Sequence, residues 1–215
     1  MDNYKLIDLD QMEASLVRRR LRKWSKVDEQ AITPLIADME QRQCLPNVHI
    51  TEPRYETNVY PLYYYWAHGQ HLSHREVYDR VFRSLPVQDV SIPEEQLRPH
   101  VARLVDCEID ILVEDVDYFV FIEAKEAVPG HKIKFENKGG VHQLVRQYVQ
   151  GRILQQLISK PFALATIGAN NGQMLELKLN SIECALLQLV YEDKVILPVA
   201  DISWPPPAAV AKSSE

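Results

Sequence analysis

The sequence is poor in cysteine and has no long apolar run, and each shortage excludes a class of protein. Its three cysteines, Cys44, Cys107 and Cys184, are odd in number and widely spaced. They form neither a disulfide framework nor a zinc site, and they fit a reducing compartment. No stretch approaches the roughly 18 apolar residues of a membrane span, and no signal peptide follows Met1. We therefore expect a soluble, cytoplasmic protein with no membrane partner.

The sequence also lacks an overall excess of positive charge, with a formal net charge of −6. The distribution of charge matters more than the sum. Residues 106–123 hold seven acids and no Lys or Arg, whereas residues 126–160 hold six bases against two acids. An acidic centre beside a basic segment suits a metal site that handles a phosphate chain, although a charge-balanced surface also fits.

The most informative segment is 107–125, which reads as a β-hairpin. Two apolar, β-rich runs, 109–113 and 118–122, flank the acidic turn 114–117. Because side chains alternate along a strand, such a turn brings position 121 opposite Asp110 and puts Glu123 diagonally beside it, on the same face. Diagonal Cβ atoms lie roughly 7–8 Å apart, which two carboxylates can close around one divalent ion. A slip of one residue would separate them.

These residue types suit a hard cation. Mg²⁺ prefers oxygen ligands and keeps several waters for substrate phosphates, so one or two carboxylates suffice. Such an ion polarises a phosphoryl oxygen and lowers the pKa of a bound water. Lys125, two residues after Glu123, can orient that water or hold charge that develops on the phosphate.

An Asp followed one strand later by Glu-x-Lys and then by a helix resembles the core of the PD-(D/E)xK nuclease superfamily, over roughly residues 70–168. The resemblance implies a restriction-endonuclease-like αβββαβ fold of the α/β class, with a mixed sheet flanked by helices. It implies Mg²⁺-dependent phosphodiester hydrolysis, for which Mn²⁺ substitutes, with Asp110 and Glu123 as metal ligands and Lys125 as a catalytic residue. Ile109 stands where the superfamily has Pro, which leaves the ligand in place.

The Glu-x-Lys motif alone means little, because the chain contains four copies, which begin at Glu123, Glu136, Glu176 and Glu192. Glu176 lies in a pattern typical of a strand with one solvated face, and Glu136 and Glu192 lie in polar segments. Only Glu123 ends a strongly apolar run, where an acid is expensive unless it is paired or metal-bound. The alternative for this copy is a surface ion pair at a strand end.

Further residues are candidates for the site or for DNA contacts. Glu108 is an accessory acid, and the basic segment offers Lys132, Lys134 and Arg146 for the phosphate backbone. Residues 141–158 predict a helix, on which Gln143 and Gln147 share a face. Gln143 and Tyr148 resemble the Gln-x-x-x-Tyr helix of some superfamily members, with a spacing of five instead of four; Tyr148 equally suits core packing. Glu76, which forms a capping box with Ser73 at the start of a helix to about residue 85, is a further accessory acid.

The remaining segments complete the predicted domain, 46–204. Residues 101–113 are expected to form the first core strand or strands, and 162–167 the last one. Residues 173–179 and 195–199 predict additional strands, with the apolar run 185–191 between them of open type. Residues 47–66 look extended. The aromatic cluster Tyr60, Tyr63, Tyr64, Tyr65 and Trp66 suits base stacking, core packing or a homodimer interface.

Outside that domain we expect an N-terminal helical extension, 1–45, and a disordered tail, 205–215. Helices are predicted over 6–24 and from Thr33-Pro34 to about 43. The basic cluster between Arg18 and Lys26 fits either a phosphate contact or a solvated helix face. His68, His71 and His74 are expected to be loop histidines without a zinc ligand set. The sequence thus predicts a Mg²⁺-dependent DNA nuclease; the alternative is a catalytically inactive nuclease-fold protein that binds nucleic acid or regulates.

Overall fold

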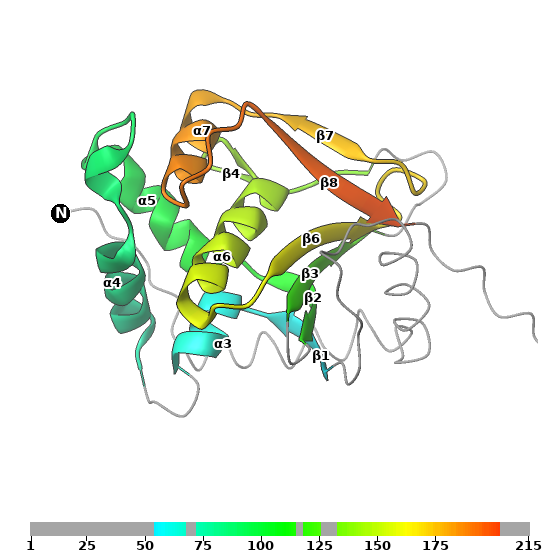
Figure 1. Cartoon of the computed structure of the whole chain (residues 1–215), viewed down its shortest axis with the longest axis horizontal. Helices are drawn as coiled ribbons and strands as arrows, with labels where there is room; N and C mark the ends of the chain where they lie inside the picture. Colours follow the sequence, from blue (N-terminus) through cyan, green and yellow to red (C-terminus); the bar gives the residue numbers. More distant parts are fainter. Residues whose placement is uncertain (1–53, 68–71, 115–117, 126–132, 203–215) are drawn as a thin grey trace, which may run out of the picture.

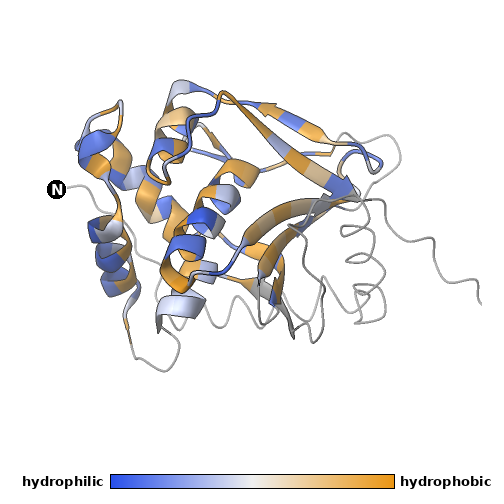
Figure 2. Ribbon diagram, viewed as in Figure 1, coloured by the Kyte–Doolittle hydropathy of each residue, from blue (hydrophilic) through white to orange (hydrophobic). Residues whose placement is uncertain are grey.

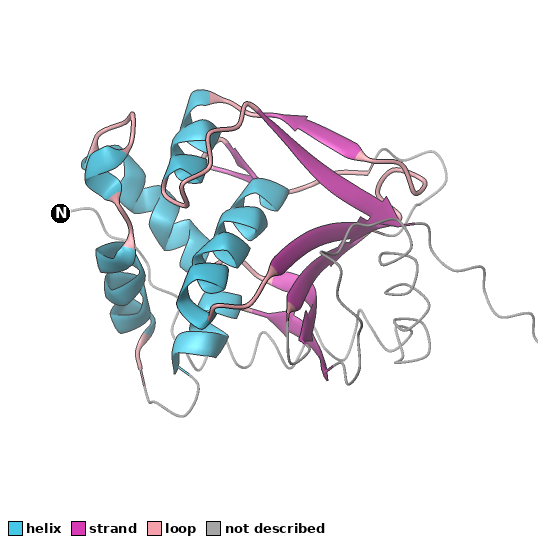
Figure 3. Ribbon diagram, in the orientation of Figure 1, coloured by secondary structure: helices cyan, strands magenta, loops and turns pink. Residues whose placement is uncertain are grey.

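The computed structural model describes residues 54–67, 72–114, 118–125 and 133–202 (Figure 1). Their strands form a six-stranded mixed sheet in the order β1-β2-β3-β6-β8-β7, beside a small β4-β5 ribbon. The described helices gather on one side of this sheet (Figure 3). In chain order the elements are β1 (Arg54–Val59), α3 (Pro61–Ala67), α4 (His74–Ser84), the 3-10 helix η1 (Val87–Asp89), α5 (Glu94–Val105), β2 (Ile109–Glu114), β3 (Phe119–Ala124), β4 (Asn137–Lys138), β5 (Val141–His142), α6 (Gln143–Ile158), β6 (Phe162–Ile167), β7 (Leu175–Lys178), α7 (Ser181–Gln188) and β8 (Ile196–Ile202).

Three antiparallel strands form one half of the sheet, and a helical crossover leads from them to the other half. β1 pairs with β2 and β2 with β3, both antiparallel. Helix α6 then carries the chain back so that β6 lies parallel to β3, and β8 lies parallel to β6. Helices α3, α4 and α5 intervene between β1 and β2. The α/β class with a mixed sheet is as the sequence predicts.

The predicted hairpin is present, but its register differs from the expected one by two residues. Ile111 lies opposite Ile122 and Glu114 opposite Phe119, so the register places position 123 directly opposite 110 instead of diagonally beside it. Two residues is one full period of a strand, so the shift changes the partner and leaves every side chain on its predicted face.

The strands β2 and β3 are buried on both faces. From Ile109 to Val113 and from Phe119 to Ala124 every residue is buried. Leu112, Phe119 and Phe121 pack into the core with the apolar sides of the helices. Figure 2 shows the strands at the centre of the sheet largely in the colour of hydrophobic residues. A strand that is covered on both faces has apolar residues at nearly every position, which explains the continuous apolar sequence of β2 and β3.

Local signals set the helix ends. The Ser73 hydroxyl accepts from the Glu76 backbone N–H at 3.3 Å while the Glu76 carboxylate accepts from the Ser73 N–H at 2.7 Å, which confirms the predicted capping box of α4. At the start of α6, Nδ1 of His142 accepts from the Leu144 N–H at 3.2 Å. Helix α7 has a second capping box, formed by Asn180 and Glu183.

Two predicted elements were wrong. Residues 101–105, expected to begin a strand, form the last turn of α5, where Leu97, Val101, Leu104 and Val105 recur at helical spacing and are buried. Of the segment expected to be extended, residues 54–59 form β1, but residues 61–67 form α3, and the partly buried rings of Tyr63, Tyr64, Tyr65 and Trp66 pack against the core. Of the run 185–191, whose type the sequence left open, residues 185–188 form the end of α7. In both cases the apolar residues are spaced so that either a strand or a helix is compatible with the sequence. Both segments form helices that pack against α6.

The predicted helices 6–24 and 33–43, the Arg18–Lys26 cluster, His68, His71, Lys132 and the tail 205–215 lie outside the described residues. His74 is described. It is the first residue of α4 and is buried, with Nε2 in contact with the Asp106 carboxylate, so it does not lie in a loop. In the part of the chain that the structure describes, none of the helices has the length and apolar character that a membrane crossing requires.

Candidate metal-binding and catalytic site

Asp110 and Glu123 lie on the same face of the sheet, on neighbouring antiparallel strands. Asp110 shares its face of β2 with Leu112, and Glu123 shares its face of β3 with Phe121, which lies opposite Leu112. Directly opposed residues have Cβ atoms only about 4.5–5.5 Å apart. Asp110 is 7% exposed and Glu123 is 2% exposed. The two acids are therefore held together in a largely desolvated place on the helix-covered face.

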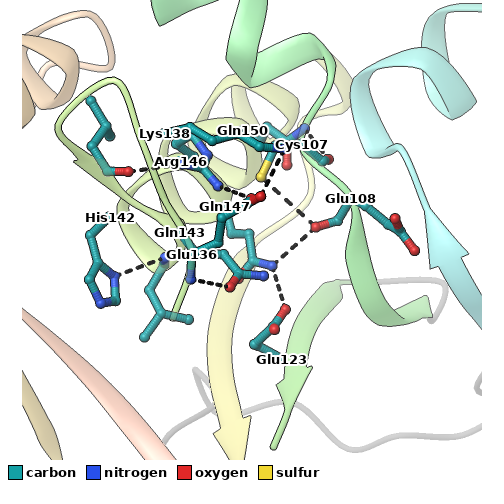
Figure 4. Close-up of polar contacts among 12 residues, drawn as sticks. Cys107, Glu108, Glu123, Glu136, Lys138, His142, Gln143, Arg146, Gln147 and Gln150 are labelled. Carbon is teal, nitrogen blue, oxygen red and sulfur yellow. Dashed lines mark hydrogen bonds and ion pairs between the residues drawn. The ribbon is translucent and has the colours of Figure 1, made fainter. Parts of the chain in front are cut away.

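Both carboxylate oxygens of Glu123 have donors. Nζ of Lys125 lies 2.5 Å from Oε1. Nε2 of Gln147 lies 2.7 Å from Oε2 (Figure 4). Asp110 accepts from the backbone N–H of Ala124 at 3.0 Å. A buried carboxylate needs such partners, because its charge has lost most of its water.

Helix α6 supplies the two glutamines that orient this group. Gln143 and Gln147 are one helical turn apart, and Oε1 of Gln143 lies 3.5 Å from Nζ of Lys125 while also accepting from the Glu136 N–H at 3.1 Å. Nζ of Lys125 is also 5.0 Å from the centre of the Phe135 ring. Gln143 thus holds the lysine and Gln147 holds the acid, as the shared helix face predicts.

The orientation of the Gln147 amide is determined by its neighbours. Its Nε2 donates to Glu123 and also to the backbone carbonyl of Glu108 at 3.2 Å, and both of these groups only accept. Its Oε1 is buried and has no hydrogen-bond donor among the described residues. A buried acceptor without a donor is costly, so this atom is suited to a water or another donor that binds at the site.

Glu108 does not add a third carboxylate to the pair. Its Oε2 accepts from the Tyr60 hydroxyl at 3.3 Å, and Figure 4 shows its carboxylate pointing away from Glu123. Residue 108 precedes β2, so strand alternation does not place it beside Asp110. Consistently, no group of three or more His, Cys, Asp or Glu among the described residues is arranged to hold a metal ion.

Arg146, a predicted phosphate contact, is buried and makes a structural interaction. It is 2% exposed; its Nη1 donates to the Val141 carbonyl at 2.9 Å and its Nη2 contacts Glu136 at 2.8 Å. A guanidinium held this way fastens the β4-β5 ribbon to α6 and is not presented to a phosphate chain. The same residue lies near Cys107, whose thiol pKa is raised to about 11, mainly by burial.

The other predicted residues lie at several places. Lys134 is exposed in the segment before β4. The Tyr148 hydroxyl donates to Glu192 at 3.1 Å and accepts from Lys194 at 3.0 Å, so it ties α6 to the segment before β8. Glu76 caps α4, which Figure 1 shows well separated from the end of β3. The structure therefore brings together Asp110, Glu123, Lys125, Gln143 and Gln147 and leaves out Glu108, Arg146, Tyr148 and Glu76.

The sequence interpretation missed Asp201, a buried acid near the end of β8. Its Oδ1 accepts from the Thr166 hydroxyl at 2.6 Å and from the Ala169 N–H at 2.9 Å. Its Oδ2 accepts from the N–H groups of Asn170 at 2.7 Å and Gly172 at 2.8 Å. With four donors this carboxylate fixes the loop that follows β6. The criterion that selected Glu123, an acid at the end of an apolar strand, would have found it.

The chain matches no protein-family model, no curated protein and no solved structure. Its chemistry has to be inferred from the group on β2, β3 and α6. Two buried acids, a lysine and two orienting amides can hold a divalent ion, position a water, or form a rigid structural network.

Proposed function

We propose that the protein is a Mg²⁺-dependent nuclease that hydrolyses phosphodiester bonds in DNA, with Asp110, Glu123 and Lys125 at its centre. The observation that carries the proposal is the burial of Asp110 and Glu123 on one face of adjacent strands. Two carboxylates so close together and so little exposed to water repel each other when both are charged. A divalent cation held between them would offset this repulsion.

The donor set fits such an ion. Carboxylate oxygens are the ligands that Mg²⁺ prefers, and an ion held by two of them keeps open positions for water and for phosphate oxygens. The amide of Gln147 that holds Glu123 also has a buried oxygen, Oε1, that accepts no hydrogen bond from the described residues. A bound water would donate to this oxygen. When bound, the ion would polarise the phosphoryl oxygen and lower the pKa of a water. Mn²⁺ would substitute for it.

The residues around the ion have separate roles. Asp110 and Glu123 would hold the ion. Lys125, which the Gln143 amide and the Phe135 ring keep beside Glu123, would orient the attacking water and hold charge that develops on the phosphate. Gln147 positions Glu123 without touching substrate. These positions are built on strands and a helix, which hold a site more rigidly than loops do.

The order of strands supports the restriction-endonuclease-like resemblance. Strands β1, β2 and β3 are antiparallel neighbours, α6 comes after β3 in the chain, and β6 returns parallel to β3. In the proposed core these elements would supply the βββαβ part, with β1 as its first strand. The three helices between β1 and β2 depart from the simple order.

DNA would approach along the exposed side of the segment that leaves β3. Lys134 is exposed there, and Lys132 is two residues earlier in the chain. Contacts of these lysines with phosphates would release counterions, so DNA binding should weaken steeply with salt and be independent of base sequence. The burial of Arg146 removes it from this set.

The alternative, an inactive nuclease-fold protein that binds nucleic acid or regulates, has one observation in its favour. Glu123 is fully hydrogen-bonded by Lys125 and Gln147 within the chain, as a purely structural carboxylate would be. An ion would have to share or displace these donors. Ion binding and cleavage must therefore be measured separately.

The test is a cleavage assay with Mg²⁺ and with Mn²⁺ on linear, circular and branched DNA, alongside calorimetric titration of Mn²⁺. We expect Asp110→Asn and Glu123→Gln to abolish ion binding and cleavage together, and Lys125→Ala to abolish cleavage alone. The losses should not add in a double variant, because the groups act as a unit. Glu95→Gln, an exposed acid on α5, is the matched control and should behave as the wild type.

The outcomes separate the two candidates. Mn²⁺ binding that needs Asp110 and Glu123, without cleavage of any DNA form, would establish the regulatory alternative. Mn²⁺ binding that is unchanged in both variants would disprove the site itself. Each variant must remain folded at the assay temperature, as checked by circular dichroism and thermal unfolding, because a lost fold would imitate a lost site.

A further inference from the structure

Strand β7 is an open edge of the sheet. It pairs with β8 on one side, and on its other side no strand of the described residues lies against it (Figures 1 and 3). Leu175 and Leu177 point to the core side, whereas Glu176 and Lys178 are exposed. Exposed edges can add a strand from another chain, and proteins either block them or use them.

The backbone groups that this edge offers can be identified from Pro198, which lies opposite Glu176. Proline has no N–H, so this pair cannot be one of the hydrogen-bonded pairs of the ladder. Three pairs further along, the Leu179 N–H donates to the Val195 carbonyl at 3.0 Å, so the hydrogen-bonded pairs are those of Leu179 and of every second residue before it. The N–H and C=O groups of Leu175, Leu177 and Leu179 therefore point toward β8. Those of Glu176 and Lys178 point outward.

We propose that two copies of this chain pair through β7, antiparallel about a two-fold axis at Leu177, into one continuous sheet. In this register Glu176 lies opposite Lys178 of the partner subunit, and Lys178 opposite Glu176 of the partner subunit. Both residues carry outward backbone groups, so the two pairs form four backbone hydrogen bonds. An isologous contact of this kind is the commonest way in which identical chains associate.

Charge selects this register over the others. For the two strands to pair, residues whose backbone N–H and C=O groups point outward must lie opposite each other. Within β7 this condition allows the two-fold axis to lie only at residue 176, 177 or 178. An axis at Glu176 would put two glutamates opposite each other, and an axis at Lys178 would put two lysines opposite each other. The axis at Leu177 alone gives two pairs of opposite charge, each of which is favourable across strands. Within the described chain neither side chain has an ion-pair partner.

The surroundings of the edge also favour a protein partner. The described residues include five large hydrophobic side chains that are exposed, and three of them lie at the β7-β8 pair: Met174 at 55%, Val195 at 70% and Ile196 at 43%. Met174 directly precedes β7, and Ile196 lies opposite Lys178. Clustered exposed apolar groups beside an unpaired edge mark an interaction surface.

The test uses charge reversal in the full chain, without metal or DNA, and it is therefore independent of the proposed nuclease activity. Dimerisation would be measured by analytical ultracentrifugation from about 1 to 200 µM. Glu176→Lys and Lys178→Glu, each alone, should weaken the dimer at least about tenfold, because both symmetric pairs become like-charged. The double swap restores opposite charges and should return the dissociation constant to within about threefold of the wild type.

A second variant tests the backbone pairing separately from charge. Glu176→Pro removes an outward N–H that β8 does not use, so it should abolish the dimer while circular dichroism and the melting temperature stay close to wild type. A wild-type chain that is monomeric over the whole concentration range would overturn the proposal. The charged side chains of β7 would then serve to prevent edge-to-edge pairing. A dimer that survives both single reversals would also overturn it, because the interface would then lie elsewhere.

Discussion

Gln147 donates a 2.7 Å hydrogen bond to Glu123, and through the same nitrogen it reaches the carbonyl of Glu108 at 3.2 Å. Helix α6 is thereby joined to β3 and to the entry of β2 at the level of the two buried acids. Glu123 is 2% exposed and Gln147 is fully buried, so water cannot replace this bond if it is lost.

Gln147→Leu should therefore destabilise the protein and impair the site. Removal of the donor leaves a buried carboxylate oxygen unpaired, which costs about 1–3 kcal/mol. The expected result is a lower free energy of unfolding in urea and weaker Mn²⁺ binding. Gln156→Leu, an exposed glutamine on the same helix, is the control and should change neither. A variant with wild-type stability would show that Lys125 alone satisfies Glu123.

The N-cap of α6 makes a pH-dependent contribution to stability. Burial lowers the pKa of His142 below its ordinary value; nearby Glu183 opposes this shift, and Arg146 and Lys125 add to it. Its Nδ1 must be unprotonated to accept from the Leu144 N–H. The unfolded chain binds the proton more readily, so stability is full above about pH 6.5 and falls as the pH drops below that value.

His142→Asn should flatten this dependence, because asparagine is a good N-cap and does not titrate. Urea unfolding at pH 7.5 and 5.5 would measure it: the wild type should lose more stability on acidification than the variant. Burial also lowers the pKa of His100, but that residue is present in both chains and cancels in the comparison. Equal losses in the two proteins would disprove the role of His142 as a titrating cap.

Asp201 should contribute strongly to stability through the loop after β6. Asp201→Asn turns one acceptor oxygen into a donor that faces N–H or O–H groups, so we expect a loss of about 3 kcal/mol. Limited proteolysis should then cut faster within residues 168–174. Asp193→Asn, at an exposed position, is the matched control. Unchanged proteolysis in Asp201→Asn would mean that the loop is held by other contacts.

Gly151 sets the contact between α6 and β6, and two principles oppose each other there. Helix propensity predicts that Gly151→Ala stabilises the helix by up to about 1 kcal/mol. A Cβ at this position would, however, overlap the Phe162 ring. Overpacking costs about 1–3 kcal/mol, so we expect net destabilisation in thermal unfolding.

A double-mutant cycle would locate the cause. In a Phe162→Leu background the ring is gone, and Gly151→Ala should become neutral or stabilising. Destabilisation of equal size in both backgrounds would place the clash elsewhere.

The sequence by itself determined those features that depend on neighbouring residues. Period-two alternation placed Asp110 and Glu123 on one face, and that result survived a register error of two residues because the period is two. The capping box at Ser73 and Glu76 needed only four consecutive residues. Gln143 and Gln147 share a helix face by spacing alone, and the structure turns both toward the site.

Only the tertiary structure decided matters that depend on what packs against a segment. Residues 101–105 are apolar enough for a strand or a helix, and burial against α6 made them helical. The sequence suggested that Arg146 is a surface base, yet it is buried and bonded to Glu136 and the Val141 carbonyl. Glu108 contacts Tyr60 instead of the site. The order of strands in the sheet brings together residues that are far apart in the chain, such as Thr166 and Asp201. The spacing of residues along the sequence does not reveal that order. The physical reason is that local patterns fix the direction of a side chain, whereas its burial and its partners are properties of the assembled sheet and helices.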